Sequence, residues 1–273
     1  IGNNSVITGN TAADGVISAG GQISIGDGTQ VLDNTATSDG KAAINLADGQ
    51  TLYIGSGAIL SGNTSNGVSS SVQAGQNTQI NVYTDATAYT FVNDGISTTA
   101  DAAPLAADQT VMTKTGAGTL VYGGTGTTDT FGGTYQQLEG NLIIGHATFG
   151  AVDSATGKVG PLQSIDGAVM GTDDTVYDIR TGQVTLAKNS TMKGASATFG
   201  GDSTLLLSDG SVLDFGTPAT FQDNSRVGIQ VSDASGNPVP LAQLRKGTES
   251  VTVTLNGTDI SGRLLNNVFL STT

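Results

Sequence analysis

The chain has 273 residues, of which 40 are Gly and none is Cys or Trp, and only 12% are charged. Average proteins carry about 25% charged residues and about 7% Gly, so charge is about half and glycine about twice the usual level. A net charge of −13 with only 10 Lys+Arg excludes the basic surface that nucleic-acid binding requires, and no apolar run is long enough for a membrane-spanning helix.

Short β-branched and leucine-rich segments recur along the chain and predict strands. Amphipathic helical periodicity is nearly absent, so we expect an all-β fold. Asp-Gly steps between the segments predict tight turns, because Gly accepts a positive φ and Asp caps its own backbone. In chain order the predicted strands lie in residues 21–25, 50–54, 78–83, 118–122, 141–145, 203–207, 211–215 and 250–255. The Asp-Gly steps begin at Asp14, Asp27, Asp39, Asp48, Asp94, Asp166 and Asp209.

Internal repetition decides how these strands are arranged. Residues 25–35 match residues 54–64 without a gap. A sandwich of hairpins has no need for such recurrence, whereas a parallel β-helix stacks equivalent residues of successive coils in register. We therefore predict a parallel β-helix with a narrow core of stacked aliphatic residues, such as Val31, Leu60, Ile80, Leu120 and Leu206.

Four asparagines, Asn10, Asn34, Asn63 and Asn224, each precede Thr or Ser in similar places of the pattern. We interpret them as mainly structural turn and ladder residues that adopt the left-handed backbone conformation, and the alternative is a role in ligand binding.

The regular spacing of the predicted strands is interrupted at about residues 86–108 and 152–174, where we expect loop insertions that leave the rod. No long linker separates two composition types, so residues 1–273 are expected to form one elongated domain.

Residues 113–145 contain a motif that carries a family resemblance. The segment closely resembles the autotransporter-associated β-strand repeat of AIDA-type passenger domains from Gram-negative bacteria. It departs from the repeat at Tyr122, Gly123 and Phe131, which are conservative or loop changes. The matching residues are Lys114, Thr115, Gly116, Gly118, Thr119, Leu120, Gly132, Gly133, Thr134, Gly140 and Leu142.

The resemblance implies a right-handed parallel β-helix that is exported through the outer membrane and exposed on the cell surface or released. We expect the chain to be a fragment of such a passenger, without the C-terminal translocator barrel. The family's repeat is associated with export and folding, and many members mediate adhesion, aggregation and biofilm growth. The implied partner is another copy of the protein or a host surface glycan or protein, with no cofactor.

Hydrolase chemistry has little support in the sequence. His146 is the only histidine and directly follows an apolar strand, and Ser203 lies in a Gly-Asp-Ser-Thr-Leu stretch that fits the repeated turn pattern. A serine hydrolase needs a serine and a histidine base brought together. We therefore interpret both residues as structural.

A polysaccharide-cleaving β-helix is the stronger enzymatic alternative. Such a site would combine Asp173 and Asp174 with Arg180, or Asp202 with Lys193. Adjacent aspartates more often form a solvated turn, so we expect no catalytic residues, no metal and no cofactor. A second alternative is an inert spacer stalk that holds another region away from the membrane.

Overall fold

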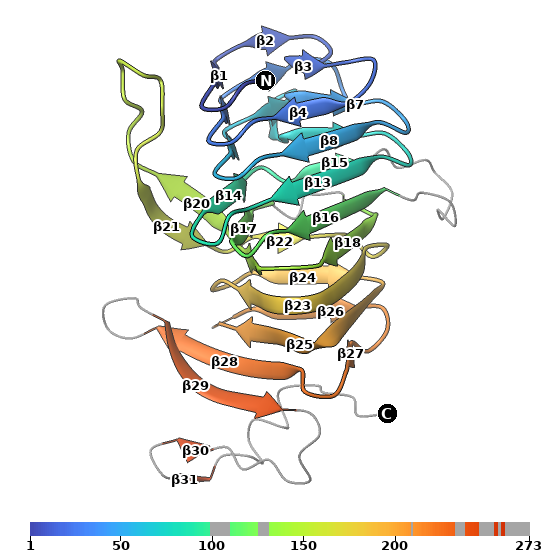
Figure 1. Cartoon of the computed structure of the whole chain (residues 1–273), viewed down its shortest axis with the longest axis vertical. Coiled ribbons are helices and arrows are strands. Elements are labelled where there is room, and N and C mark those ends of the chain that lie inside the picture. The colour runs from blue at the N-terminus through green and yellow to red at the C-terminus, as the bar shows by residue number, and fades with distance from the viewer. Residues whose placement is uncertain are drawn as a thin grey trace.

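The computed structural model is all-β in the part of the chain that it describes, and its strands stack along one axis (Figure 1). Most neighbouring strands pair in parallel, which confirms the predicted all-β, mostly parallel architecture and is consistent with a solenoid. No described segment is a helix of the length and apolarity needed to cross a membrane. Side chains are described as far as residue 228. The described residues are 1–98, 110–124, 131–208, 210–232, 238–245, 254–255 and 258–259.

Two long stacks of parallel strands form the body of the rod, and two strands belong to both. The first stack consists of β4 (Ile23–Ile25), β8 (Thr51–Ile54), β13 (Gln79–Tyr83), β16 (Val111–Thr115), β18 (Thr134–Gln137), the first parts of β23 (Val176–Leu186) and β25 (Ser196–Leu207), and β27 (Thr220–Phe221). The second stack consists of β1 (Val6–Thr8), β5 (Gln30–Leu32), β9 (Ile59–Ser61), β14 (Tyr89–Val92), β17 (Thr119–Tyr122), β19 (Asn141–Ile144), the last parts of β23 and β25, and β28 (Arg226–Ser232).

Shorter strands complete the rod. A third stack contains β3 (Ile17–Ser18), β7 (Ile44–Leu46), β12 (Val72–Ala74) and β15 (Ile96–Thr98), and a separate sheet contains β22 (Val169–Met170), β24 (Thr191–Gly194) and β26 (Val212–Phe215). A small sheet contains β2 (Thr11–Ala12), β6 (Thr35–Ala36), β10 (Thr64–Ser65) and β11 (Val68–Ser69). Antiparallel pairs are β20 (His146–Phe149) with β21 (Leu162–Asp166), β10 with β11, β28 with β29 (Pro238–Arg245), and β30 (Thr254–Leu255) with β31 (Thr258–Asp259).

The internal repeat corresponds to one coil of the chain, here called a rung, which stacks on the next coil. Val31 pairs with Leu60 and Thr35 with Thr64, as the match between residues 25–35 and 54–64 predicts. Side chains that alternate along each strand point into a common core, because successive residues of a strand face opposite sides. One inward ladder of the first stack runs through Ile23, Leu52, Ile80, Met112, Tyr135, Tyr177 and Ala197.

Four of the five predicted core aliphatics are fully buried, and the fifth prediction is wrong. Leu206 is only half-buried, and its neighbour Leu205 occupies the core position. A shift of one residue moves a strand side chain to the other face. The triplet of leucines in the sequence does not show which of them faces inward.

Six of the seven predicted Asp-Gly turns have a glycine with positive φ, and Gly167 is the exception. The interpretation of the asparagines as left-handed turn residues is wrong for Asn10, Asn34 and Asn63, and it holds for Asn224, whose φ is 71°. The residues preceding the first three, Gly9, Asp33 and Gly62, take the left-handed conformation instead, with φ of 66°, 52° and 70°.

The two expected insertions have different structures. Residues 89–98 of the first form β14 and β15 within the stacks, which corrects the start of the insertion, and residues 99–108 lie outside the described residues. The second includes an antiparallel hairpin of residues 146–166, here called the arm, which projects beside the rod (Figure 1). The chain rejoins the body at β22, so residues 169–170 are not part of a loop.

The arm covers an apolar strip on the outer side of the second stack. Phe149 and Ile165 of the arm pack with Phe91 and Val121, and the rings of Phe91 and Phe149 meet edge to face at 5.0 Å between centroids. Further along, the backbone N–H of Val159 donates to Oε1 of Gln30 at 2.9 Å. The arm therefore runs back along the rod toward its N-terminal rungs.

Candidate functional site

Lys114, the first matching residue of the repeat-like segment 113–145, points into the rod. It continues the inward ladder of Ile25, Ile54 and Val82 and is fully buried. Its Nζ donates to the backbone carbonyls of Thr115, Gly116 and Glu139 at 2.9, 2.6 and 3.3 Å. The lysine therefore links the turns of two successive rungs by hydrogen bonds.

Gln137 is the register partner of Lys114 and performs the same task one rung further on. Its Nε2 donates to the carbonyl oxygens of Gly140 and Thr181, both at 2.9 Å. Buried carbonyls need hydrogen-bond partners. These two buried side chains provide partners for carbonyls of a partly buried corner.

Burial lowers the pKa of Lys114 to about 8, while the carboxylate of Glu139 acts in the opposite direction. The unfolded chain then binds more protons than the folded chain above about pH 8, so the free energy of unfolding should rise with pH. Between about pH 7.5 and about pH 9.5 we expect a gain of about 2 kcal/mol. Urea titrations at both pH values measure this gain.

Lys114→Met should abolish that gain, whereas substitution of the exposed Lys188 by Met should preserve it. Equal pH dependence in the wild type and Lys114→Met would contradict the assignment.

Glycines of the repeat permit close packing of successive rungs at both ends of β16 and β18. Gly116 and Gly140 have φ of 77° and 75°. A Cβ on Gly118 would lie 1.9 Å from the carbonyl oxygen of Asp85, and one on Gly133 would lie 2.2 Å from that of Thr110. Gly132 has more room, since a Cβ there would have no neighbour closer than 3.5 Å.

The remaining repeat residues are strand positions. Leu120 and Leu142 are register partners and fully buried, as expected. Thr119 pairs with Asn141 in the same two strands, while Thr115 and Thr134 lie half-buried on the first stack. The repeat is thus a structural unit of two rungs, and Lys114, the one charged residue among its matching positions, points into the core.

Asn10, Asn34 and Asn63 form a hydrogen-bonded ladder across three rungs. The backbone N–H and Nδ2 of Asn10 donate to Oδ1 of Asn34, and the same two groups of Asn34 donate to Oδ1 of Asn63, all at 3.0–3.1 Å. Asn34 and Asn63 are fully buried. Asn224 is exposed and does not join them.

Asp94 terminates the ladder, a role that the sequence analysis missed. Its carboxylate accepts from the backbone N–H groups of Gly62 and Asn63 at 3.1 and 2.9 Å and from Oγ of Ser71 at 2.8 Å. Burial raises the pKa of Asp94, and these hydrogen bonds oppose the shift. The recurrence of Asn at this position in earlier rungs was the available signal.

The neighbouring Asn93 holds the base of the arm against the rod by two hydrogen bonds. Its Oδ1 accepts from the backbone N–H of Ala147 at 2.6 Å, and its Nδ2 donates to the carbonyl of Ala147 at 2.8 Å. Nε2 of His146 lies 3.4 Å from the same Nδ2. The single histidine therefore lies where the arm leaves the rod, far along the chain from Ser203, whose Oγ donates to the carbonyl of Gly200.

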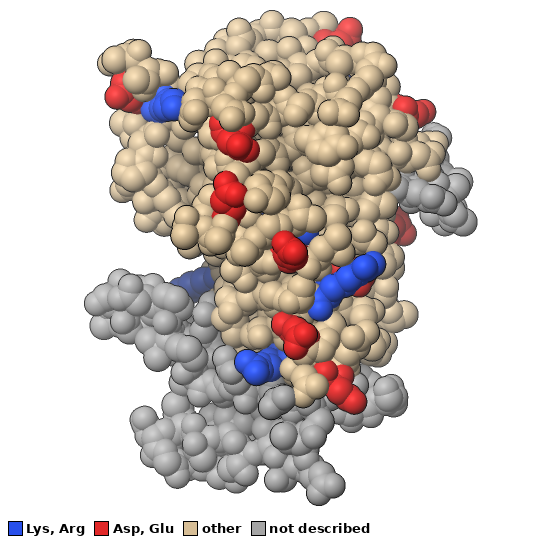
Figure 2. Space-filling model, viewed as in Figure 1, with Lys and Arg blue, Asp and Glu red and all other residues tan. Residues whose placement is uncertain are grey.

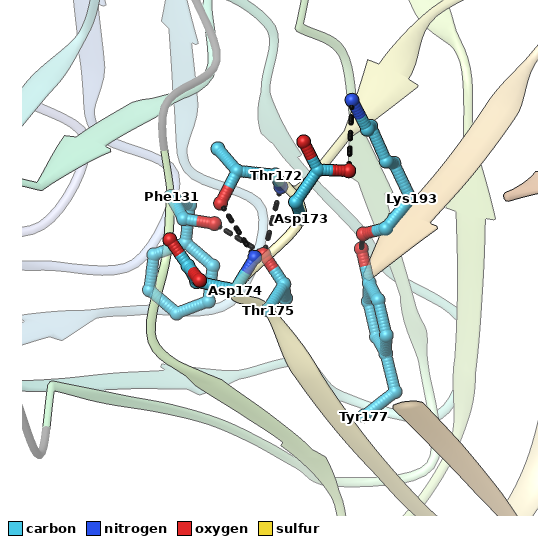
Figure 3. A network of polar contacts seen from close by, with 7 residues as sticks. All are labelled: Phe131, Thr172, Asp173, Asp174, Thr175, Tyr177 and Lys193. Carbon is cyan, nitrogen blue, oxygen red and sulfur yellow. Dashed lines mark hydrogen bonds and ion pairs between the residues drawn. The ribbon is translucent and has the colours of Figure 1, made fainter. Parts of the chain in front are cut away.

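The residues proposed for polysaccharide cleavage do not converge. Asp173 pairs with Lys193 at 3.1 Å, and Arg180 pairs with Asp178 at 2.9 Å. Figure 3 shows the carboxylates of Asp173 and Asp174 pointing away from each other. The turn is closed by the hydroxyls of Thr175 and Thr172, which accept from the backbone N–H groups of Thr172 and Asp174. The combination of Asp173 and Asp174 with Arg180, considered as the enzymatic alternative, is therefore not formed.

Asp202 lies apart from Lys193 as well, beside a small polar cavity. The two ion pairs between described residues do not include Asp202. The cavity has a volume of about 280 Å³ and is lined by Gly201, Asp202, Ser203, Thr204, Asn224 and Arg226. Within the described part of the chain, no three His, Asp or Glu residues are grouped so that they could hold a metal ion.

The outer side of the first stack presents a flat, mostly neutral ladder. Its outward-pointing residues are Ser24, Tyr53, Asn81, Thr113, Gln136, Asp178, Thr198 and Thr220. Figure 2 shows widely spaced acidic side chains on a surface that is otherwise largely uncharged. Comparisons with protein families, curated proteins and solved structures gave no match to this chain.

Proposed function

We propose that this chain is part of an AIDA-type autotransporter passenger, a right-handed parallel β-helix that acts as an adhesin on the surface of a Gram-negative bacterium. The outward ladder of the first stack carries the proposal. The side-chain amides of Asn81 and Gln136 in this ladder make no hydrogen bond to a described residue, and both residues are half-exposed. Their amides are available to hydrogen-bond a partner surface.

Many weak contacts suit this surface. One hydrogen bond contributes only about 0.5 to 1.5 kcal/mol, so adhesion would depend on a long face and on many copies per cell. The favoured partner is another copy on a neighbouring cell, and a host surface glycan or protein is the other candidate. Two rods of net charge −13 repel each other unless exposed cations such as Arg180 meet acids of the partner.

Cell settling tests the proposal. Cells that display the chain should settle faster than cells without it, and the double variant Asn81→Asp with Gln136→Glu should settle several-fold more slowly. The two substitutions preserve shape but place like charges on the proposed contact face. The effect should shrink in high salt, because the Debye length falls from about 10 Å at 0.1 M to about 3 Å at 1 M.

A matched control adds the same two charges elsewhere. Gln73→Glu lies on the third stack and Gln163→Glu on the arm, and we expect normal settling from this variant. An equal loss in both variants would reject the first stack as the contact face. No settling with the unmodified chain would reject homotypic adhesion and favour a host ligand or a spacer role.

A further inference from the structure

The exposed tyrosines gather at one corner of the rod. Tyr53, Tyr83 and Tyr89 have 42%, 50% and 47% of their surface exposed, and they are the only strongly exposed aromatic residues in the described part of the chain. The other three tyrosines of the sequence are buried in the core: Tyr122, Tyr135 and Tyr177.

Adjacent strands place the three rings near one turn. Tyr83 ends β13 and Tyr89 begins β14, so both flank the turn of residues 84–88. Tyr53 lies on the neighbouring strand β8, where its register partner is Asn81, two residues before Tyr83. We call this group, with Asp85 of the turn, the exposed tyrosine cluster.

Contacts with neighbouring residues of the rod position the rings of Tyr83 and Tyr89. The hydroxyl of Tyr83 donates to Oδ1 of Asp85 at 2.9 Å. The Tyr83 ring lies over Gly116, where an added Cβ would be 2.9 Å from its Cε2. Tyr89 stacks on Phe91 with an interplanar angle of 18° and 6.2 Å between centroids. Both rings are positioned while about half of each remains exposed to solvent.

Three carboxylates influence the Tyr83 ring. Asp85 raises the pKa of Tyr83 through its hydrogen bond and its charge, and Asp27 and Glu139 add to this effect. The two ion pairs among described residues involve neither Asp85 nor these two acids. The second oxygen of Asp85, Oδ2, accepts no hydrogen bond from a described residue.

We propose that the exposed tyrosine cluster binds arginine side chains of a basic segment on a partner protein. A guanidinium stacks on the face of a tyrosine ring and can also donate in-plane hydrogen bonds to a carboxylate. Aromatic faces beside a free carboxylate oxygen match both features, and the net charge of −13 steers a cationic partner toward the rod. The inference rests on the proposed function only in placing the partner outside the cell.

Binding of a fluorescein-labelled oligoarginine peptide to the purified chain, followed by fluorescence anisotropy, tests the proposal. The triple variant Tyr53→Leu, Tyr83→Leu and Tyr89→Leu keeps the net charge and should bind about tenfold more weakly, because each exposed cation–π contact contributes modestly. Circular dichroism establishes that the variant is folded. An oligolysine peptide should bind the wild type more weakly than oligoarginine.

A second pair of variants separates the local carboxylate from net charge. Asp85→Asn should weaken oligoarginine binding several-fold, whereas Asp48→Asn should not, although each removes one exposed carboxylate that accepts a hydrogen bond at a turn. Equal affinity of the triple variant and the wild type would overturn the proposal, and so would equal effects of the two aspartate substitutions.

A maltooligosaccharide is tested in parallel. Tyrosine-dependent binding of this neutral sugar without binding of the peptide would reject a cationic ligand in favour of a glycan. Normal peptide binding without cell settling would contradict only the proposed function, and normal settling without peptide binding would contradict only this inference.

Discussion

Gly140→Ala should destabilise the rod by about 3 kcal/mol or more, the sum of the strain of a left-handed alanine and the displacement of packed backbone. Gly140 has φ of 75°, and an added Cβ would lie 2.3 Å from the carbonyl oxygen of Gly116 and 2.4 Å from that of Gly118. Neither oxygen belongs to a flexible side chain. Urea unfolding followed by circular dichroism measures the loss.

Gly49→Ala is the matched control. Gly49 has a similar φ of 71°, but an added Cβ there would have no neighbour within 4 Å. Its cost should be limited to the backbone conformation, about 1 kcal/mol. Equal destabilisation by the two substitutions would show that the close approach of successive turns at Gly140 contributes nothing.

Asp94→Ala should cost about 3 to 5 kcal/mol, because each buried donor left unpaired costs about 1 to 3 kcal/mol. The substitution removes the acceptor for the backbone N–H groups of Gly62 and Asn63 and for the hydroxyl of Ser71. Asp94→Asn keeps one side-chain oxygen as an acceptor and should cost less. Thermal and urea unfolding of the three proteins measure the order of stability.

Asp27→Ala tests whether burial causes the large effect. Asp27 also accepts a backbone hydrogen bond, from Ser56 at 2.9 Å, but it is exposed at a turn where water can replace it. We expect a loss below about 1 kcal/mol for this variant. A loss for Asp94→Ala no larger than that for Asp27→Ala would mean that water satisfies the end of the asparagine ladder.

Both predictions concern places where successive rungs contact each other closely. Lys114 donates a hydrogen bond to the carbonyl of Glu139 in the next rung, and Asn34 is joined to Asn63 by a buried hydrogen bond. A shielded bond has no competing water, so it fixes the register of one rung on the next. A regular outer ladder of the kind proposed for adhesion requires that register.

The sequence by itself determined the features that depend on neighbouring residues. Recurring β-branched and leucine-rich segments predicted the strands, Asp-Gly steps predicted turns with positive φ, and the match of residues 25–35 with residues 54–64 predicted the rung. These signals are local or repeat along the chain. They also identified Leu120 as a core residue.

Only the tertiary structure decided features that join residues distant in sequence. The repeat aligns Asn34 with Asn63, but only the structure shows that Asp94 ends their ladder, because Asp94 lies outside the matched segments. Lys193 pairs with Asp173 rather than Asp202. Residues 152–166, expected as a loop, belong to an arm that covers an apolar strip. Such contacts follow from how rungs stack, which a single stretch of sequence does not specify.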